Sequence, residues 1–94
     1  MRLPRHPTHP GQMLFEEFLK PLGMSQLAFA RHLGVPYGRI HQIVKGRRSL
    51  SPETAWLFSH ALGTSPLFWM NLQTAYDLVH HKAPRRVPRL IKAG

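Results

Sequence analysis

The chain has 94 residues and carries thirteen Lys and Arg against four Asp and Glu, so its formal net charge is +9 at pH 7 and it favours polyanionic partners. The hydrophobic fraction of 43% excludes a disordered chain, and the length allows one domain with a modest core, which favours a dimer. Because the chain contains no Cys, disulfides and thiolate chemistry are excluded. With neither a long apolar run nor a signal peptide, the chain is expected to be cytoplasmic.

The first ten residues contain three prolines and show no helical period, so we predict an irregular arm there. His6 and His9 stand three residues apart, which on a helix would suit a pair of metal ligands. The prolines exclude a helix at this point, and no Cys or nearby carboxylate completes a ligand set. We therefore predict no metal site.

A helix over residues 11–20 is predicted because Leu14 and Phe18 recur at helical spacing on one face, with two glutamates on the other. Pro21 and Gly23 are predicted to end this helix. Proline lacks the N–H that a further turn needs, and glycine accepts a left-handed backbone.

The stretch SQLAFARHLGVPYGRIHQIVK, which begins at Ser25, has the pattern of two short helices that share a tight turn. Ser25 is a good N-cap for a helix over residues 26–33, and Gly34 ends the apolar period because it can adopt a positive φ. Pro36 suits the first turn of the next helix, which we expect to run to about Lys45. The second and third helices are thus predicted to form a helix-turn-helix.

Two further helices begin with one shared signal, a serine N-cap followed by proline at the first helical position. Ser51 and Pro52 begin the fourth helix, which Gly63 ends, and Ser65 begins a fifth helix over residues 66–80. The chain has no strand pattern, so we predict an all-α domain of five helices. The predicted buried residues are Ala55, Phe58, Ser59 and Leu62 in the fourth helix and Phe68, Leu72, Ala75 and Tyr76 in the fifth.

The cations are concentrated in two parts of the chain. No acidic residue lies between Glu17 and Glu53, and none follows Asp77. The first interval contains Lys20, Arg31, Arg39, Lys45, Arg47 and Arg48, and the last thirteen residues contain Lys82, Arg85, Arg86, Arg89 and Lys92. We predict an irregular arm over residues 1–10, a helix-turn-helix domain over residues 11–80 and a basic, mobile tail over residues 81–94.

A helix-turn-helix places the N-terminal part of its second helix in the major groove of DNA. The outward positions predicted to read bases are Tyr37, Gly38, Arg39, His41 and Gln42. Arg39 has a guanidinium fork suited to guanine O6 and N7, and Gln42 can pair with adenine N6 and N7, each worth about 1–3 kcal/mol of discrimination. Gly38 costs the helix about 1 kcal/mol relative to Ala, and its role stays open. The predicted phosphate contacts are Ser25, Gln26, Lys45, Arg47 and Arg48.

Four large apolar side chains could belong either to the core or to an interface. Trp56 and Leu57 lie beside the predicted buried face of the fourth helix, and Trp69 and Tyr76 lie on the fifth. A second copy of the chain or another protein could cover them. A two-fold dimer would place two reading helices about 34 Å apart and would bind a palindromic site.

Three motifs outside the reading helix carry a family resemblance. They are HPG at residues 9–11, SPET at residues 51–54 and GTSPLFWMNLQTAYDL at residues 63–78. With them, residues 9–78 resemble the HigA-type, or VapI-like, antitoxins of bacterial toxin–antitoxin modules, within the Xre, or Cro/cI-like, helix-turn-helix superfamily. The resemblance implies a lambda-repressor-like fold and a nucleoid-associated homodimer that binds a palindromic operator and represses its own operon. It also implies a HigB toxin partner, an mRNA interferase of the RelE-like fold.

Two other functions stay open on the sequence. The chain could be an Xre-type transcriptional regulator without a toxin partner, or an interaction module whose basic tail binds acidic surfaces or RNA. The latter would bind without sequence preference, whereas a repressor would strongly prefer its own promoter. An enzyme is not expected, because the four carboxylates form no acid–base pair and no nucleophile motif occurs. No cofactor is expected.

Overall fold

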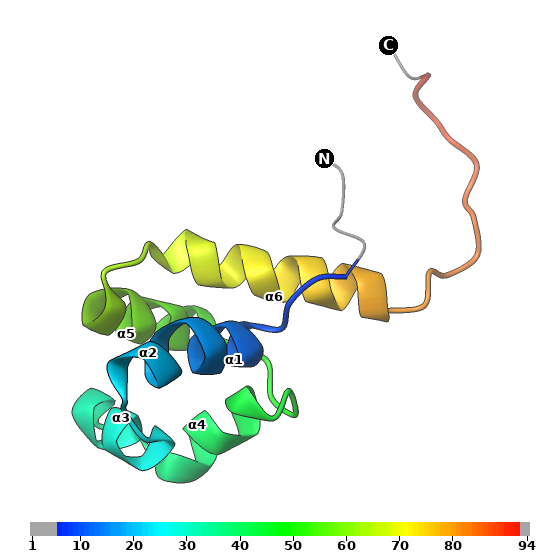
Figure 1. Ribbon diagram of the computed structural model, residues 1–94. Helices are drawn as coiled ribbons and strands as arrows, with labels where there is room; N and C mark the ends of the chain where they lie inside the picture. Colours follow the sequence, from blue (N-terminus) through cyan, green and yellow to red (C-terminus); the bar gives the residue numbers. More distant parts are fainter. Residues whose placement is uncertain (1–5, 93–94) are drawn as a thin grey trace.

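The computed structural model describes residues 6–92, and within them it contains five helical segments and no strand (Figure 1). This confirms the predicted all-α fold. The first segment is continuous and comprises α1 (Pro10–Met13), the π-helical η1 (Leu14–Leu19) and α2 (Lys20–Leu22). The others are α3 (Gln26–Leu33), α4 (Tyr37–Val44), α5 (Pro52–Leu62) and α6 (Pro66–His80). Residues 1–5 of the predicted arm and residues 93–94 of the predicted tail lie outside the described residues.

Serine N-caps begin three of the helices, as predicted. The Ser25 hydroxyl accepts from the backbone N of Ala28 at 3.0 Å. The equivalent bonds of Ser51 and Ser65, to residues 54 and 68, measure 3.2 and 3.0 Å. Each bond satisfies a backbone donor that the helix itself leaves free, which is why the starts of α3, α5 and α6 could be predicted to the residue.

Three predicted helix boundaries differ from the structure by one or two residues, and proline is involved in each. The first helical segment begins at Pro10, one residue before the predicted start. Pro21 lies inside the first helical segment, which ends only at Gly23, where φ is 64°. A wider π-helical turn precedes Pro21, and such a turn relieves the clash between a proline ring and the preceding turn. Pro36 has an extended backbone (ψ 142°) and is the N-cap of α4, so that helix begins at Tyr37. The carbonyl of Pro36 accepts the first helical bond from Arg39 N at 3.1 Å.

The helices pack in two groups around α1 (Figure 1). The helices α5 and α6 contact each other, α3 and α4 contact each other at the opposite side, and α1 touches both α4 and α6. Phe29 of α3, Phe58 of α5 and Trp69 of α6 meet between these groups, with ring centroids 5.5 Å apart for the two phenylalanines and 5.1 Å apart for Phe58 and Trp69. This aromatic cluster holds the helix-turn-helix against the rest of the domain.

The buried face of α6 is displaced by one residue from the prediction. Trp69 and Gln73 are the buried residues of this helix, whereas the predicted stripe, Phe68, Leu72, Ala75 and Tyr76, is only half-buried. In α5, Ala55 and Phe58 are buried as predicted, and Ser59 and Leu62 are half-buried. The predicted buried face was chosen from apolar residues and so left out Gln73, but a glutamine can be buried when its amide is fully hydrogen-bonded.

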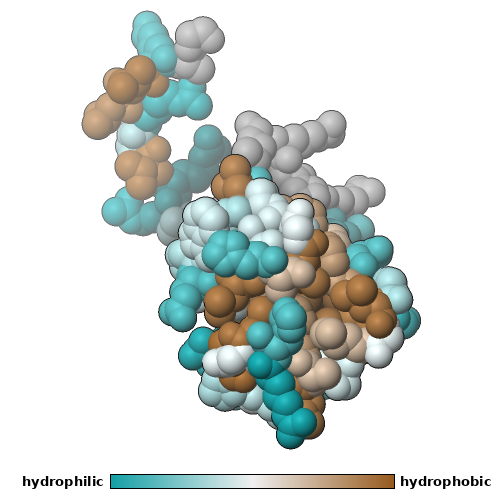
Figure 2. Space-filling model, turned by 90° about the vertical axis from the view of Figure 1, so that its left-hand side faces the viewer, coloured by the Kyte–Doolittle hydropathy of each residue, from teal (hydrophilic) through white to brown (hydrophobic). Residues whose placement is uncertain are grey.

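Of the two alternatives left open for Trp69, the structure supports the core. Its side chain has no exposed area, and its indole N–H donates to Thr64 Oγ1 at 2.6 Å, so it has no surface to offer a partner. Trp56, in contrast, is 54% exposed, while Leu57 and Tyr76 are half-buried. Hydrophobic side chains reach the surface beside hydrophilic ones on the face shown in Figure 2. The most exposed large apolar side chains of the helices are Leu22, Trp56, Leu67 and Leu78.

The backbones of α1 and α4 come close together at Gly11. A Cβ atom added there would lie 1.7 Å from the carbonyl oxygen of Ile43, near the end of α4. Only a residue without a side chain fits this crossing. The glycine of the HPG motif therefore sets how closely α1 packs against α4.

In the part of the chain that the structure describes, none of the helices is long and apolar enough to cross a membrane.

Candidate nucleic-acid interface

The helix α4 buries one face and presents the other to solvent. Ile40 and Ile43 are fully buried, which turns the predicted base-reading side of the helix outward. That side contains Tyr37, Gly38 and Gln42, which are exposed, and Arg39 and His41, which are half-buried. The structure thus brings the five predicted base-reading residues together on one helix at the lower edge of the view in Figure 1.

Tyr37, His41 and Gln26 form one polar cluster across the turn of the helix-turn-helix. The rings of Tyr37 and His41 stack with centroids 5.4 Å apart, and Tyr37 Oη lies 3.3 Å from His41 Nδ1. The same nitrogen lies 3.2 Å from Gln26 Oε1, at the start of α3. The predicted base contacts Tyr37 and His41 are therefore preorganised with the predicted phosphate contact Gln26, a link that residue spacing did not reveal.

Arg39 and Gly38 lie side by side in the first turn of α4 and differ in packing. The Arg39 Nε atom is buried without a hydrogen-bond partner, although the residue as a whole is only half-buried. A Cβ atom at Gly38 would meet nothing within 4 Å. Packing within the domain does not require a glycine at this position.

The predicted phosphate contacts flank α4 at both ends of the helix-turn-helix. Ser25 caps α3 with its oxygen, which leaves the hydroxyl proton free to donate. Lys45, Arg47 and Arg48 follow α4 and are exposed. The salt bridge found within residues 6–92 joins Lys20 to Glu16 (3.1 Å). Lys45, Arg47 and Arg48 are therefore not neutralised by a carboxylate of the described residues.

The loop after α4, which we call the basic loop (residues 46–50), is fixed at both ends. Gly46 adopts φ 73° and lets the chain leave the helix, and the Arg47 backbone N donates to the Gln42 carbonyl at 2.9 Å. At the other end, Leu50 is buried, and its backbone N donates to Gln73 Oε1 of α6 at 2.7 Å. The two arginines lie between these anchors.

His9 is a structural residue whose importance the sequence pattern did not reveal. Its Nδ1 accepts from the backbone N of Gly11 at 2.9 Å and so caps α1. Its ring is only 7% exposed, meets Tyr76 of α6 edge-on at 4.8 Å and lies against Gly46. Burial lowers the pKa of His9 below its usual value, with Asp77 opposing the shift and His80 adding to it. The HPG motif was the signal that could have identified this cap.

Stability is expected to fall as the pH drops through about 6.5, because His9 must stay neutral to accept its capping bond. The lowered pKa means that the unfolded chain takes up this proton before the folded chain does, so acid favours unfolding. Urea unfolding at several pH values between 5 and 8 measures this. His9→Asn, which caps without titrating, should flatten the pH dependence; an unchanged dependence would contradict the assignment.

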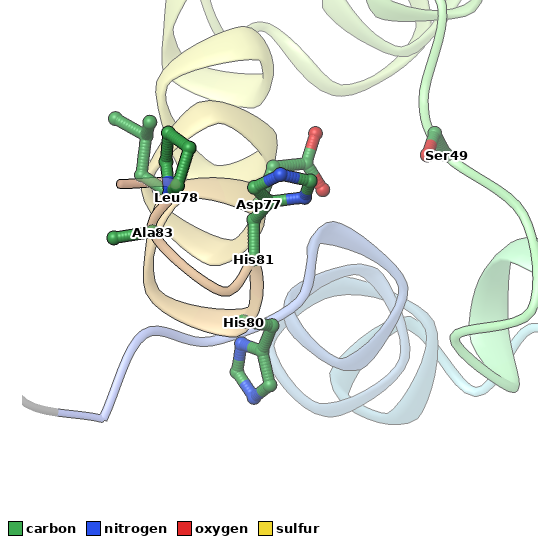
Figure 3. A pocket seen from close by; sticks show the side chains of 7 residues that line it. Ser49, Asp77, Leu78, His80, His81 and Ala83 are labelled. Atoms are coloured by element: carbon green, nitrogen blue, oxygen red, sulfur yellow. The ribbon is translucent and has the colours of Figure 1, made fainter. Parts of the chain in front are cut away.

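A hollow of about 670 Å³ lies between the basic loop and the C-terminal end of α6 (Figure 3). Ser49 lies on one side of it and the end of α6, with Asp77, on the other. The remaining lining residues are Leu78, His80, His81, Ala83 and Pro84. Beyond it, residues 82–92 form no helix, are exposed throughout and lead away from α4 (Figure 1).

Comparison with known proteins relates this arrangement to bacterial antitoxins and regulators. A family model described as "Helix-turn-helix" matches residues 15–69. Virulence-associated protein I of Dichelobacter nodosus is 44% identical over 70 residues, which are 74% of this chain and 65% of that relative, so the chain matches somewhat less than two thirds of its length. Antitoxin HigA-1 of Vibrio cholerae is 38% identical over 74 residues, which cover 79% of this chain and 70% of that protein.

A solved structure with a similar fold includes promoter DNA. It is the Pseudomonas aeruginosa antitoxin HigA with the higBA promoter. The two proteins are 39% identical with a TM-score of 0.76, and the matched region covers 79% of this chain and 80% of that chain.

Proposed function

Because the chain belongs to the Xre-type helix-turn-helix family, in the group of the HigA antitoxins, we propose that it is a sequence-specific DNA-binding antitoxin. It binds a palindromic operator as a homodimer, represses its own operon and neutralises a HigB-like mRNA interferase. It is not an enzyme, and its place is in the cytoplasm, on the nucleoid.

The observation that carries this proposal is the outward face of α4. Arg39 and Gln42 lie on that face, and exposed cations follow it in the basic loop. Recognition of a DNA sequence requires side chains that hydrogen-bond to base edges, together with cations nearby that bind the phosphates. Gly38 leaves open space at the same place, which favours close approach of a base or of the sugar-phosphate backbone.

For the dimer or toxin interface we retain Trp56, Leu57 and Tyr76 and leave out Trp69. Trp56 is the strongest of these candidates, because more than half of a large apolar side chain is open to solvent. A two-fold axis would bring two α4 helices into successive major grooves about 34 Å apart.

The proposal is tested by an electrophoretic mobility shift with the chain's own promoter and a scrambled duplex. We expect binding to the promoter to be at least about a thousand times tighter, in the range of specific repressors. Purification of the native protein should also recover a small basic protein encoded in the same operon. Equal binding to both duplexes would refute the operator assignment, and a preparation without any such protein would favour a regulator without a toxin.

Deletion of residues 82–94 is expected to leave the preference for the operator unchanged. The described part of the tail leads away from α4 and contributes nothing to the reading face (Figure 1). Loss of its cations should weaken binding to operator and scrambled DNA by the same factor. Titration of both duplexes at one salt concentration gives the ratio of the two affinities. If the deletion brings this ratio close to one, the tail contributes to sequence recognition.

A further inference from the structure

The buried amide of Gln73 connects α6 to the loop that carries the phosphate-contacting arginines. Its side chain is 4% exposed. Its Oε1 accepts from the backbone N of Leu50 at 2.7 Å, and its Nε2 donates to Asp77 Oδ1 at 2.8 Å. The first of these bonds joins residues 23 positions apart and fixes the end of the basic loop.

Asp77 determines which way the amide of Gln73 faces. A carboxylate only accepts hydrogen bonds, so it takes the Nε2 group and leaves Oε1 to face Leu50. Without Asp77 the amide could turn over and present an N–H group to the N–H of Leu50. Asp77 thus orients the Gln73 amide so that its Oε1 is the acceptor for the backbone N–H of Leu50.

We propose that Gln73 is the positioning residue that holds Arg47 and Arg48 in place for contact with DNA phosphates. The inference rests on the DNA binding proposed above. The Arg47 backbone is fixed to α4 at Gln42, and Gln73 fixes the other end of the loop to α6. Loss of the second anchor lets the two arginines move, so that they no longer meet the backbone in register with the reading helix. Base reading by α4 does not depend on this anchor.

The test uses two variants that keep the net charge of the chain. Gln73→Met retains length and burial but has no acceptor for Leu50. In Gln73→Glu combined with Asp77→Asn, the new carboxylate can accept from both Leu50 and the new amide, so both bonds survive with the second reversed. The measurement is the slope of log affinity for the operator against log salt, at a temperature where circular dichroism shows every variant folded.

We expect Gln73→Met to lower the salt slope by about 0.9 for each phosphate that is no longer neutralised, which is about 1.8 for the two arginines of each protomer and about 3.6 for the proposed dimer. Its preference for operator over scrambled DNA should stay at the wild-type value. The paired variant should restore the wild-type slope. In the NMR spectrum, the Leu50 amide should lose its protection from hydrogen exchange in Gln73→Met and keep it in the paired variant.

An unchanged slope in folded Gln73→Met would overturn the inference, as would a paired variant that behaves like Gln73→Met. Arg47→Ala with Arg48→Ala supplies the reference, because adding Gln73→Met to it should not lower the slope further. A wild-type protein without preference for its operator would instead refute the proposed function, and that result is read directly from the same titrations.

Discussion

Replacement of Arg39 by Ala is expected to abolish the preference of the protein for its own operator. The guanidinium of Arg39 is the best-suited group on the outward face of α4 for guanine O6 and N7, and losing such a pair costs about 1–3 kcal/mol at each half-site. In a two-fold complex both half-sites lose it, so the combined loss of about 2–6 kcal/mol is comparable to the lower part of the margin of about 4–10 kcal/mol that separates specific from non-specific binding. Mobility-shift titrations of the variant on operator and scrambled DNA measure the ratio.

A matched control separates base reading from charge. Arg86→Ala removes the same charge from the exposed tail, away from α4, and should lower affinity for both duplexes while keeping their ratio. The Arg39 side chain also packs against the domain through its buried Nε, so thermal melting of both variants must accompany the titrations. A folded Arg39→Ala protein that still prefers its operator like the wild type would show that another residue reads the sequence.

Replacement of Gly11 by Ala is expected to have the largest effect on stability. The added Cβ would lie 1.7 Å from the Ile43 carbonyl oxygen and 2.7 Å from the Cα of Val44, and backbone atoms of a packed helix cannot move aside as the tip of a side chain can. Overpacking commonly costs about 1–3 kcal/mol, and a backbone overlap of this size belongs at or above the upper end. For a domain of this length, that corresponds to a melting temperature lower by roughly 10–25 °C.

Gly38→Ala is the corresponding control for Gly11→Ala. It adds the same methyl group to another helix, but at a place where nothing lies within 4 Å. Because alanine favours a helix over glycine by about 1 kcal/mol, this variant should be more stable than the wild type. If thermal melting gives the two variants similar stabilities, α1 and α4 do not cross this closely in solution.

Much of the helical framework was predictable because its signals are local. A serine oxygen reaches an amide three residues away, so Ser25, Ser51 and Ser65 identified the starts of three helices without knowledge of the fold. The outward position of Arg39 and Gln42 also followed from the period of α4, since Ile40 and Ile43 had to face the core. The boundaries at Pro21 and Pro36 were wrong because proline is compatible with more than one place in a turn.

Contacts between distant residues could not be predicted in this way. Tyr37 and His41 are neighbours four residues apart on α4, but only the packing of α3 against α4 brings Gln26, fifteen residues from His41, into the same cluster. His9 looked like an ordinary residue of the arm until the packing of α6 placed Tyr76 beside its ring. The residue pattern of the arm and that of α6 do not by themselves indicate that His9 and Tyr76 come into contact.

The sequence by itself determined the five helices, the outward face of α4 and the basic character of its surroundings, because each depends on residues within one or two helical turns. Only the tertiary structure decided that Trp69 is core, that Gly11 lies directly against the backbone of α4, and that Gln73 holds the basic loop. The physical reason is that burial, steric overlap and the pairing of buried polar groups are properties of two surfaces in contact, and those surfaces come from distant parts of the chain.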